Sequence, residues 1–456
     1  MLGWLKVKDT IFRSYDIRGK YPSDINEDIA YKIGLGYGSI LQEKYKQSSC
    51  CVSMDNRLSS PSIHDSLIKG LLETGINVID YGLTTTPMNY YCRYINSIYG
   101  IMITASHNPK DENGFKFSFD KYSNARGNMI IEFRDYVKKG VFLKGTGSYV
   151  KRSIHDEYIN HLVNNLRISN KKLKVVFDPA NGAVTSILEY ILKKVNIDYI
   201  IINKESDGSF PNHPADPSIE SNLSMLKSAV IENQADMGIG FDGDGDRIGI
   251  IDNKGILVPI EIYGILMAKD MFYEVDNKTF MYDAKCSNIY KDELKKIKAN
   301  TVICRTGSSY TEEMIHKDNL PFGIQYVGHI GINDRFYSIE SAIYASLRLV
   351  EILSHTDKTL SEIVNEYPKY YNIEEMRINS TEDKKRIVID NIKKYCLSKN
   401  FYIREIDGLR VEFSNGWAYV RASNTGPTIN LRCEAKSKED LDNITNIFIE
   451  LINRLN

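Results

Sequence analysis

The chain has 456 residues, too many for one hydrophobic core, so roughly three or four domains of ~100–150 residues each are expected. Its composition, with 42% hydrophobic and 26% charged residues, is ordinary for a soluble globular protein. The net charge of −1 gives no bulk field that would attract nucleic acid or an anionic membrane, which argues against both as partners.

Three further absences in the sequence bear on where the protein works. No apolar run approaches the ~18 residues of a membrane span. The start, MLGWLKVKDTIF, carries lysines and an aspartate too early for a signal peptide. The seven cysteines are scattered and form no C-x-x-C pair, which is typical of a reducing compartment. We therefore expect a cytoplasmic protein.

Strand-like and helix-like patterns alternate through most of the chain, as in α/β proteins. The first cycle predicts helices at 27–41 and 62–73, strands at 50–55 and 77–81, and a helix entered at Pro87. The second predicts strands at 174–178, 199–203 and 237–241, and helices at 183–194 and 222–232. The third predicts helices at 260–272, 312–318 and 338–353 around a strand at 279–283. The three cycles hint at repeated domains, although the sequence has no strict period.

The last part of the chain has a different pattern. Residues 355–371 are polar and charged and are expected to form a linker. Beyond it, helices are expected at 381–397 and 437–454, with short strands near 411–413, 417–421 and 429–432. This pattern predicts a smaller α+β domain.

The stretch Tyr99–Phe119 contains the first candidate for chemistry. An apolar run, Ile101–Thr104, predicts a buried strand that delivers Ser106 onto a loop, and a second strand-like run follows at Phe115–Phe119. A hydroxyl at the end of a core strand is held firmly and is expected to face outward. Locally, a turn that uses Ser, Asn and Pro only for backbone reasons remains an alternative.

The sharpest signal is GFDGDGDRIGII at 240–251. Asp242, Asp244 and Asp246 alternate with glycines in a loop between two apolar strands, so their carboxylates can converge. Hard oxygen ligands in this number suit magnesium. An EF-hand is excluded, because Arg247 stands where that loop needs glycine and Asn253 stands where it needs a chelating Glu. A solvated acidic turn is the alternative, but three crowded carboxylates repel one another without a cation.

Ser106 lacks the G-x-S-x-G context of a hydrolase nucleophile, and on an extended chain its neighbour His107 would point away from it. Phosphorylation offers another activation, because a phosphoserine beside a tri-aspartate magnesium site would be a phosphoryl donor. Lys116 and Arg247 are candidates to offset the charge on the phosphoryl oxygens, although either could be an ordinary surface cation.

Near the C-terminus, RASNTGPTINLR (421–432) places an arginine, hydroxyls and an amide in a strand–loop–strand setting. Such a loop can bind a phosphate. The local sequence fits a turn with only a structural role equally well.

Together these segments resemble the α-D-phosphohexomutases, specifically the bacterial phosphomannomutase/phosphoglucomutase type. The resemblance runs the whole length of the chain. It rests on an ordered set of motifs: FRSYDIRG (12–19), DNRLSS (55–60), TASHNP with NGFKF (104–117), DPANG (178–182), DGSFPNHPADP (207–217), DGDGDR (242–247), DAKCS (283–287), RTGSS (305–309), GH (328–329) and RASNTGP (421–427).

The resemblance implies an α/β fold with three similar α/β domains and a smaller C-terminal α+β domain around a central cleft. We expect the phosphoserine loop in domain I (1–150), the metal loop in domain II (151–253), the sugar-binding loop in domain III (254–360) and the phosphate-binding loop in domain IV (370–456).

The resemblance also implies a role for each candidate residue. Ser106 would be the phosphoserine, and one Mg²⁺ would be held by its phosphate with Asp242, Asp244 and Asp246. The transfer site would be lined by Tyr15, Arg18, His107, Lys116 and Arg247. The sugar would be met from domain III by Lys285, Ser308, Gln325, Val327 and His329, with His329 a candidate proton carrier. The non-reacting phosphate would be held by Arg421, Ser423, Asn424, Thr425 and Thr428.

The implied reaction interconverts hexose 1-phosphate and hexose 6-phosphate, with glucose and/or mannose as the sugar. Phosphoserine would give its phosphoryl group to the free hydroxyl, and the bound 1,6-bisphosphate would turn and return its other phosphate to Ser106. Glucose 1,6-bisphosphate would act as activator, and the protein would be a monomer or a weak dimer.

The sugar loop departs from the usual family pattern G-E-x-S-G-H. Gln325 and Val327 stand where Glu and Ser are usual, Ser308 stands where many members have His, and ESA (340–342) replaces D-D-G. Glutamine loses the charge, and valine cannot form a hydrogen bond. Two alternatives therefore remain, namely a phosphoglucosamine mutase and a phosphosugar-binding homologue with weakened or lost catalysis. A complete Ser106 and tri-aspartate set argues against the binding protein.

Overall fold

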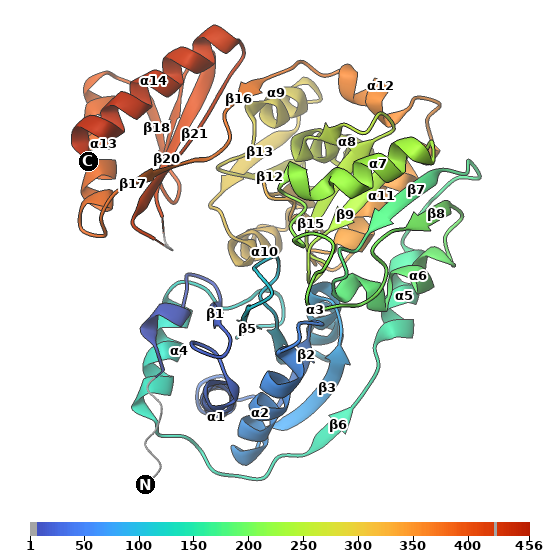
Figure 1. Cartoon of the computed structure of the whole chain (residues 1–456), viewed down its shortest axis with the longest axis vertical. Coiled ribbons are helices and arrows are strands. Elements are labelled where there is room, and N and C mark those ends of the chain that lie inside the picture. The colour runs from blue at the N-terminus through green and yellow to red at the C-terminus, as the bar shows by residue number, and fades with distance from the viewer. Residues whose placement is uncertain (1–6, 424–425) are drawn as a thin grey trace.

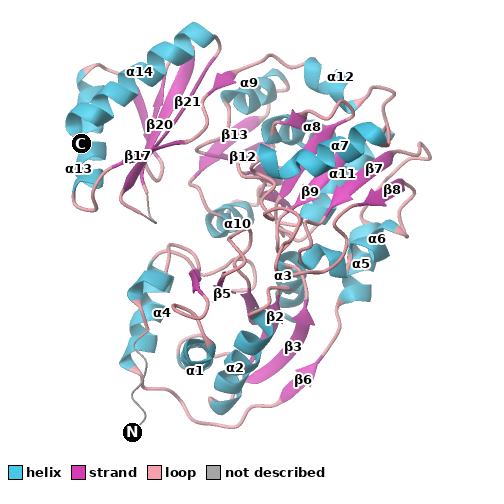
Figure 2. Ribbon diagram, viewed as in Figure 1, coloured by secondary structure: helices cyan, strands magenta, loops and turns pink. Residues whose placement is uncertain are grey.

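A computed structural model describes residues 7–423 and 426–456 of the chain (Figure 1). It contains four separate β-sheets, each accompanied by helices (Figure 2). Figure 1 shows the N-terminal, blue part below, the green and yellow parts together above it, and the red C-terminal part to one side. None of the helices in the described ranges is both long enough and apolar enough to cross a membrane.

The first sheet has the strand order β1-β5-β4-β2-β3-β6. Its strands are β1 (Ile17–Lys20), β2 (Ser49–Met54), β3 (Asn77–Leu83), β4 (Tyr99–Ile103), β5 (Glu112–Phe117) and β6 (Tyr149–Lys151). A 3₁₀ turn η1 (Asp9–Ile11) precedes them, and the helices are α1 (Glu27–Glu43), α2 (Ser60–Glu73), α3 (Thr86–Asn96) and α4 (Asn128–Lys139). Side chains of Asn26 and Thr85 cap the first turns of α1 and α3, which fixes where these helices begin.

The second sheet has the order β11-β10-β9-β7-β8. Its strands are β7 (Lys174–Asp178), β8 (Asp198–Ile201), β9 (Met237–Phe241), β10 (Ile248–Asp252) and β11 (Leu257–Val258). The accompanying helices are α5 (His155–Asn164), η2 (Ala183–Ser186), α6 (Leu188–Leu192), η3 (Glu220–Leu223) and α7 (Ser224–Glu232).

The third sheet has the order β13-β12-β14-β15. Its strands are β12 (Thr279–Asp283), β13 (Asn300–Cys304), β14 (Phe322–Ile324) and β15 (Ile330–Ile332). The helices are α8 (Ile260–Met271), α9 (Asn288–Lys296), α10 (Ser308–Lys317), α11 (Ala342–Ser354) and α12 (Leu360–Asn365).

The first three sheets share one topology. In each, a central strand (β2, β7 or β12) pairs in parallel with the next strand on one side and the third strand on the other. The third strand then turns back into an antiparallel hairpin, β4–β5, β9–β10 or β14–β15. The predicted repetition of three α/β domains is therefore confirmed at the level of strand order.

The fourth sheet is antiparallel and has the order β16-β21-β20-β19-β18, with β17 also paired to β21. Its strands are β16 (Tyr371–Asn372), β17 (Met376–Asn379), β18 (Tyr402–Glu405), β19 (Leu409–Glu412), β20 (Gly416–Ala422) and β21 (Thr428–Ala435). Helices α13 (Lys384–Ser398) and α14 (Lys438–Leu455) accompany it. This unit is the predicted smaller α+β domain.

The apolar cores divide the molecule unevenly. One cluster of buried side chains joins the second and third sheets and reaches the first through α3. A separate cluster fills the rest of the first domain, and another belongs to the fourth domain alone. The C-terminal domain therefore has its own core, whereas the second and third domains share one.

The structure differs from several predicted elements. The helix expected at 183–194 is broken at Ile187 into η2 and α6. Helix α10 begins at Ser308, four residues before the predicted start, and α11 begins at Ala342 because the Ser341 side chain caps it there. The expected linker at 355–371 contains α12, which starts with a capping box of Thr359 and Glu362.

Candidate functional site

The candidate residues converge because they lie on the three equivalent hairpins. Ser106 lies between β4 and β5, the acidic loop lies between β9 and β10, and His329 lies between β14 and β15. The Ser106 hydroxyl donates to Asp242 Oδ2 at 2.9 Å. Arg247 forms an isolated antiparallel bridge with His329, and the Ile248 amide donates to the carbonyl of Gly328 at 3.1 Å. The hairpins of three domains therefore meet at one place.

Ser106 is buried rather than facing outward, with only 1% of its surface exposed. Its φ of 53° turns the chain, so the expectation of an extended backbone is wrong at this position. As a result His107 does not point away, and its Nδ1 lies 3.2 Å from Ser106 Oγ. Burial, together with the nearby Arg247, lowers the pKa of His107 well below its usual value, so this imidazole is neutral near pH 7.

Two buried arginines hold the serine loop in place. The Arg57 guanidinium donates to the carbonyls of Ser106, Asn108 and Pro109, each at 2.7 Å. Arg18 donates to the carbonyl of Ala105 at 2.9 Å. Because these carbonyls accept hydrogen bonds from charged donors, the loop is held in place without the backbone hydrogen bonds of a β-sheet.

The acidic loop is shaped by its own first carboxylate. Asp242 Oδ1 accepts hydrogen bonds from the backbone N–H groups of Gly245, Asp246 and Arg247, at 3.0, 3.0 and 3.2 Å. A Cβ atom at Gly243 would lie 2.5 Å from the carbonyl oxygen of Ser106. Glycine is therefore required there for the metal loop to approach the serine loop.

The three aspartates form a compact, buried set. Carboxylate oxygens of Asp242, Asp244 and Asp246 all lie within 4.8 Å of one another. The Lys116 ammonium donates to Asp244 Oδ2 at 2.7 Å and to Asp246 Oδ2 at 2.6 Å. Thr86 and Thr104 also donate to Asp244 Oδ2, at 2.6 and 3.2 Å.

This set suits a hard divalent cation. Burial and the two neighbouring carboxylates raise the pKa of Asp242 well above its usual value. Although burial would also raise them, Lys116 keeps the pKa values of Asp244 and Asp246 below the usual range. The outer oxygens Asp244 Oδ1 and Asp246 Oδ1 are buried without a hydrogen-bond partner among the described residues. Oxygen donors of this kind, with spare lone pairs and excess negative charge, fit magnesium.

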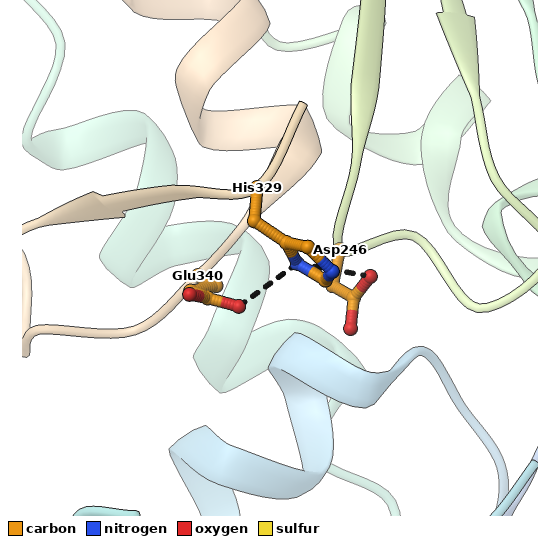
Figure 3. Close-up of side chains that lie close together, drawn as sticks. All are labelled: Asp246, His329 and Glu340. Carbon is orange, nitrogen blue, oxygen red and sulfur yellow. Dashed lines mark ion pairs between the residues drawn. The ribbon is translucent and has the colours of Figure 1, made fainter. Parts of the chain in front are cut away.

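His329 lies between the metal loop and Glu340 (Figure 3). Its Nε2 accepts from Arg247 Nε at 2.8 Å, so in the neutral ring the proton is on Nδ1. Nδ1 lies 2.9 Å from Glu340 Oε2 and 3.5 Å from Asp246 Oδ1. Burial, together with Arg247 and Lys116, lowers the pKa of His329 well below its usual value. Burial and nearby carboxylates raise the pKa of Glu340.

In the sugar loop, the side chain of Gln325 is bound within the protein. Gln325 is 1% exposed, and its amide donates to Glu340 Oε1 at 3.4 Å. Val327 is half-buried and offers no polar atom. Ser308 is buried at the start of α10. A Cβ atom added at the preceding Gly307 would lie 3.1 Å from the Tyr15 ring. Tyr15 of the first domain thus lies against the third.

Lys285 and the predicted phosphate loop lie where the third and fourth domains meet. The Lys285 ammonium donates to Glu375. Arg421 donates to Asp407 Oδ2 at 2.9 Å, and Asp407 Oδ1 accepts from Arg305 of the RTGSS motif at 3.0 Å. Asp407 therefore joins Arg421 of the fourth domain to Arg305 of the third.

The phosphate loop itself is held by a lysine that the sequence did not single out. Lys385 on α13 is buried, and its ammonium donates to the carbonyls of Ser423 and Gly426 at 2.7 and 3.1 Å. The Ser423 amide donates to the carbonyl of Thr428 at 2.9 Å, which closes the turn. Asn424 and Thr425, which were also predicted for this site, lie outside the described residues.

Three buried residues at the site were missed as candidates: Arg57, Glu340 and Lys385. Arg57 lies in a quoted motif and Glu340 in a segment noted for its departure from the family pattern, so both carried a signal. Lys385 carries none, because it is one of many lysines on a polar helix. Only the fold brings its ammonium to the loop.

Four family models match the chain in order. They describe phosphoglucomutase/phosphomannomutase α/β/α domain I at residues 9–139, domain II at 156–255, domain III at 261–371, and the C-terminal domain at 375–451.

Whole-length relatives agree with these matches. A phosphomannomutase/phosphoglucomutase of Pseudomonas putida is 34% identical over 445 residues, covering 96% of this chain and 95% of that one. A phosphoglucomutase of Neisseria meningitidis is 32% identical over 448 residues, covering 97% and 96%. The crystal structure of a phosphoglucomutase/phosphomannomutase family protein from Burkholderia thailandensis matches with a TM-score of 0.92 at 27% identity, covering 98% of both chains.

Proposed function

Because the chain belongs to the phosphoglucomutase/phosphomannomutase family, we propose that it interconverts hexose 1-phosphate and hexose 6-phosphate through a phosphoserine at Ser106. The sugar would be glucose, mannose or both. The observation that carries the proposal is the hydrogen bond from the Ser106 hydroxyl to Asp242 at 2.9 Å, inside a buried set of three carboxylates. A protein that only binds phosphosugars needs neither group.

In the first step, the bond between phosphorus and Ser106 Oγ breaks while a bond forms between phosphorus and the free hydroxyl oxygen of the substrate. The hydroxyl proton would pass to Nε2 of His329, and because the lone pair of this nitrogen accepts from Arg247 Nε at 2.8 Å, that hydrogen bond must be given up first. Ser106 Oγ, the leaving oxygen, takes up one proton, so the step as a whole moves a single proton from the substrate hydroxyl, by way of His329, to Ser106, which becomes the hydroxyl that donates to Asp242. The product of this step is a bound hexose 1,6-bisphosphate.

In the second step, the bisphosphate turns end for end and gives its other phosphoryl group back to Ser106. Lys116, Arg247 and Arg18 would balance the negative charge that spreads over the phosphoryl oxygens. Arg421 and the loop held by Lys385 would bind the phosphate that is not reacting, in either orientation. Lys285 would contact the sugar.

Asp242, Asp244 and Asp246, with an oxygen of the phosphoserine, would hold one Mg²⁺. When bound, this ion supplies positive charge that neutralises the phosphoryl group and the crowded carboxylates. Burial of the serine keeps water from the phosphoserine, which would otherwise be lost by hydrolysis.

The first test is intact mass before and after incubation with Mg²⁺ and glucose 1,6-bisphosphate. Gain of one phosphate, absent from the Ser106→Ala variant, is expected. The same variant should lose turnover by ~10³-fold or more, because the phosphoryl donor is gone. Activity of Ser106→Ala within tenfold of the wild-type rate would contradict the relay.

A further inference from the structure

We propose that Glu375 is a sugar-binding residue whose carboxylate, held between Lys285 and Asn430, accepts hydrogen bonds from hydroxyl groups of the bound hexose phosphate. The proposal rests on the proposed function, since it concerns the same substrate. Glu375 lies between β16 and β17, on the segment that enters the fourth domain.

The carboxylate has two fixed partners from different domains. One oxygen accepts from the ammonium of Lys285, which follows β12 in the third domain. The other accepts from the side-chain amide of Asn430 on β21 in the fourth domain. The Glu375 side chain is 19% exposed and the Lys285 side chain 10%, so the pair is sheltered but can still be reached from solvent.

The charge state suits an acceptor. Burial alone would raise the pKa of Glu375, but Lys285, Arg421 and the bond from Asn430 together bring it below the usual value. Glu375 is therefore an ionised carboxylate at neutral pH. It can accept hydrogen bonds and cannot donate them.

Spare hydrogen-bonding capacity remains on all three residues. An ionised carboxylate has about four acceptor positions and an ammonium has three donors, and the contacts above use only part of these. Asn430 Oδ1 is buried and has no hydrogen-bond partner among the described residues. A sugar hydroxyl both donates and accepts, so it could donate to Glu375 or Asn430 while accepting from Lys285. This combination of groups matches adjacent hydroxyls on a hexose ring.

The sugar loop does not supply an equivalent acceptor. The amide of Gln325 is buried against Glu340, and Val327 has no polar atom. Within residues 7–423 and 426–456, Glu375 is the carboxylate that binds Lys285. Discrimination between hydroxyl arrangements would then come from the segment between the third and fourth domains rather than from the β14–β15 turn.

The test is calorimetric binding of glucose 6-phosphate to the unphosphorylated full-length protein and to its Glu375→Gln variant. Glutamine keeps the shape but removes the charge, and loss of a hydrogen bond to a charged group should weaken binding about 10-fold or more. Inorganic phosphate should bind both proteins equally within about twofold. The adjacent Glu374→Gln is the matched control, because Glu374 is exposed, and its binding should not change.

Deoxy analogues of glucose 6-phosphate separate a direct sugar contact from a structural ion pair. At least one analogue that lacks a single ring hydroxyl should bind the wild type more weakly than glucose 6-phosphate does. The Glu375→Gln variant should bind that analogue and glucose 6-phosphate equally. If Glu375→Gln weakens the binding of glucose 6-phosphate and of every analogue by the same factor, the proposal is overturned. Glu375 would then only hold the third and fourth domains together.

Tighter binding of inorganic phosphate by Glu375→Gln, with sugar discrimination unchanged, would also overturn the proposal. Glu375 would then act as an internal anion that occupies the phosphate site. These binding measurements do not need turnover. Failure of the proposed function would appear separately, as no transfer of phosphate to Ser106 from glucose 1,6-bisphosphate.

Discussion

Three aspartates show how single residues repeat a structural role across the domains. Asp55, Asp178 and Asp283 each end the central strand or follow it directly, and each accepts from a backbone N–H two residues later. The acceptor is Oδ1 in all three, at 3.1, 2.9 and 3.0 Å. The side chain thus turns the backbone as it leaves the sheet. Each motif that begins with Asp, in DNRLSS, DPANG and DAKCS, therefore has a conformational reason.

Asp178 has a second role that makes a prediction about pH. Its Oδ2 lies 3.0 Å from Nε2 of His213, whose Nδ1 faces the carbonyl of Pro214 at 2.9 Å. Burial would lower the pKa of His213, but Asp178 and this carbonyl raise it above the usual value. The folded state thus binds a proton more tightly than the unfolded state does. This contribution to stability is complete below about pH 6.5 and is lost as the pH rises through the folded-state pKa.

His213→Gln should therefore destabilise the protein more at pH 6 than at pH 8.5. Loss of a hydrogen bond to a charged group costs about 1.5–3 kcal/mol, and the difference from wild type should narrow as the imidazole of the wild type becomes neutral. Urea unfolding midpoints at the two pH values measure this. An equal difference at both would mean that His213 is neutral in the folded protein.

At the scale of elements, the sequence predicted the apolar strands next to Ser106 and the acidic loop, because β4, β9 and β10 are mostly apolar runs of five residues each. It did not predict β14 and β15, which have three residues each and carry no periodicity. The serine, the three aspartates and the 421–432 loop were predicted from local patterns, and most of the other site residues came from the family resemblance. What the sequence alone could not give is the meeting of the three hairpins, because contacts such as Arg247 to His329 depend on how the domains pack.

The β14–β15 turn yields a prediction about charge. Gln325→Glu would place a carboxylate against Glu340, whose pKa is already raised by burial and by neighbouring carboxylates. In the folded protein the pKa of the introduced glutamate would be raised too. The variant should therefore lose stability above the pKa that glutamate has in the unfolded chain, by about 2–4 kcal/mol at pH 8 and by less at pH 5.5. Melting temperatures at both pH values test this. Val327→Ser in the same turn is the control and should shift the melting temperature little, because Val327 is half-buried. Equal melting temperatures for wild type and Gln325→Glu at pH 8 would contradict it.

At the scale of the whole molecule, the sequence predicted a separate, smaller last domain, and the structure gives that domain a core of its own. How it is attached to the third domain could not be predicted, because most of the contacts are polar, several involve backbone atoms, and the apolar cluster between the domains is small. Arg432 donates to the carbonyl of Lys285 at 3.1 Å and lies over the Tyr326 ring at 3.7 Å. Glu434 accepts from the Asn288 amide at 2.9 Å, at the start of α9. Contacts of this kind cannot be predicted from the spacing of apolar residues in the sequence.

Arg410 of the fourth domain makes two of the backbone contacts with the third domain. It is fully buried, its guanidinium lies 4.0 Å from the centre of the Trp417 ring, and it donates to the carbonyls of Ala284 and Cys286 at 2.5 and 3.1 Å. Arg410→Ala would leave both carbonyls without this donor and open a cavity beside Trp417. Loss of a hydrogen bond from a charged donor costs about 1.5–3 kcal/mol, and both bonds to these carbonyls are lost here.

Because the fourth domain has its own core, this loss should separate the domains rather than unfold the whole chain. We expect differential scanning calorimetry of Arg410→Ala to show an early transition that the wild type lacks, and proteolysis to cut faster within residues 366–375. Affinity for glucose 6-phosphate should also fall, since the two carbonyls flank Lys285. Arg404→Ala is the control, because that arginine lies in the same domain with 41% of its side chain exposed. A wild-type calorimetric profile for Arg410→Ala would show that Arg432 and Glu434 hold the domain without it.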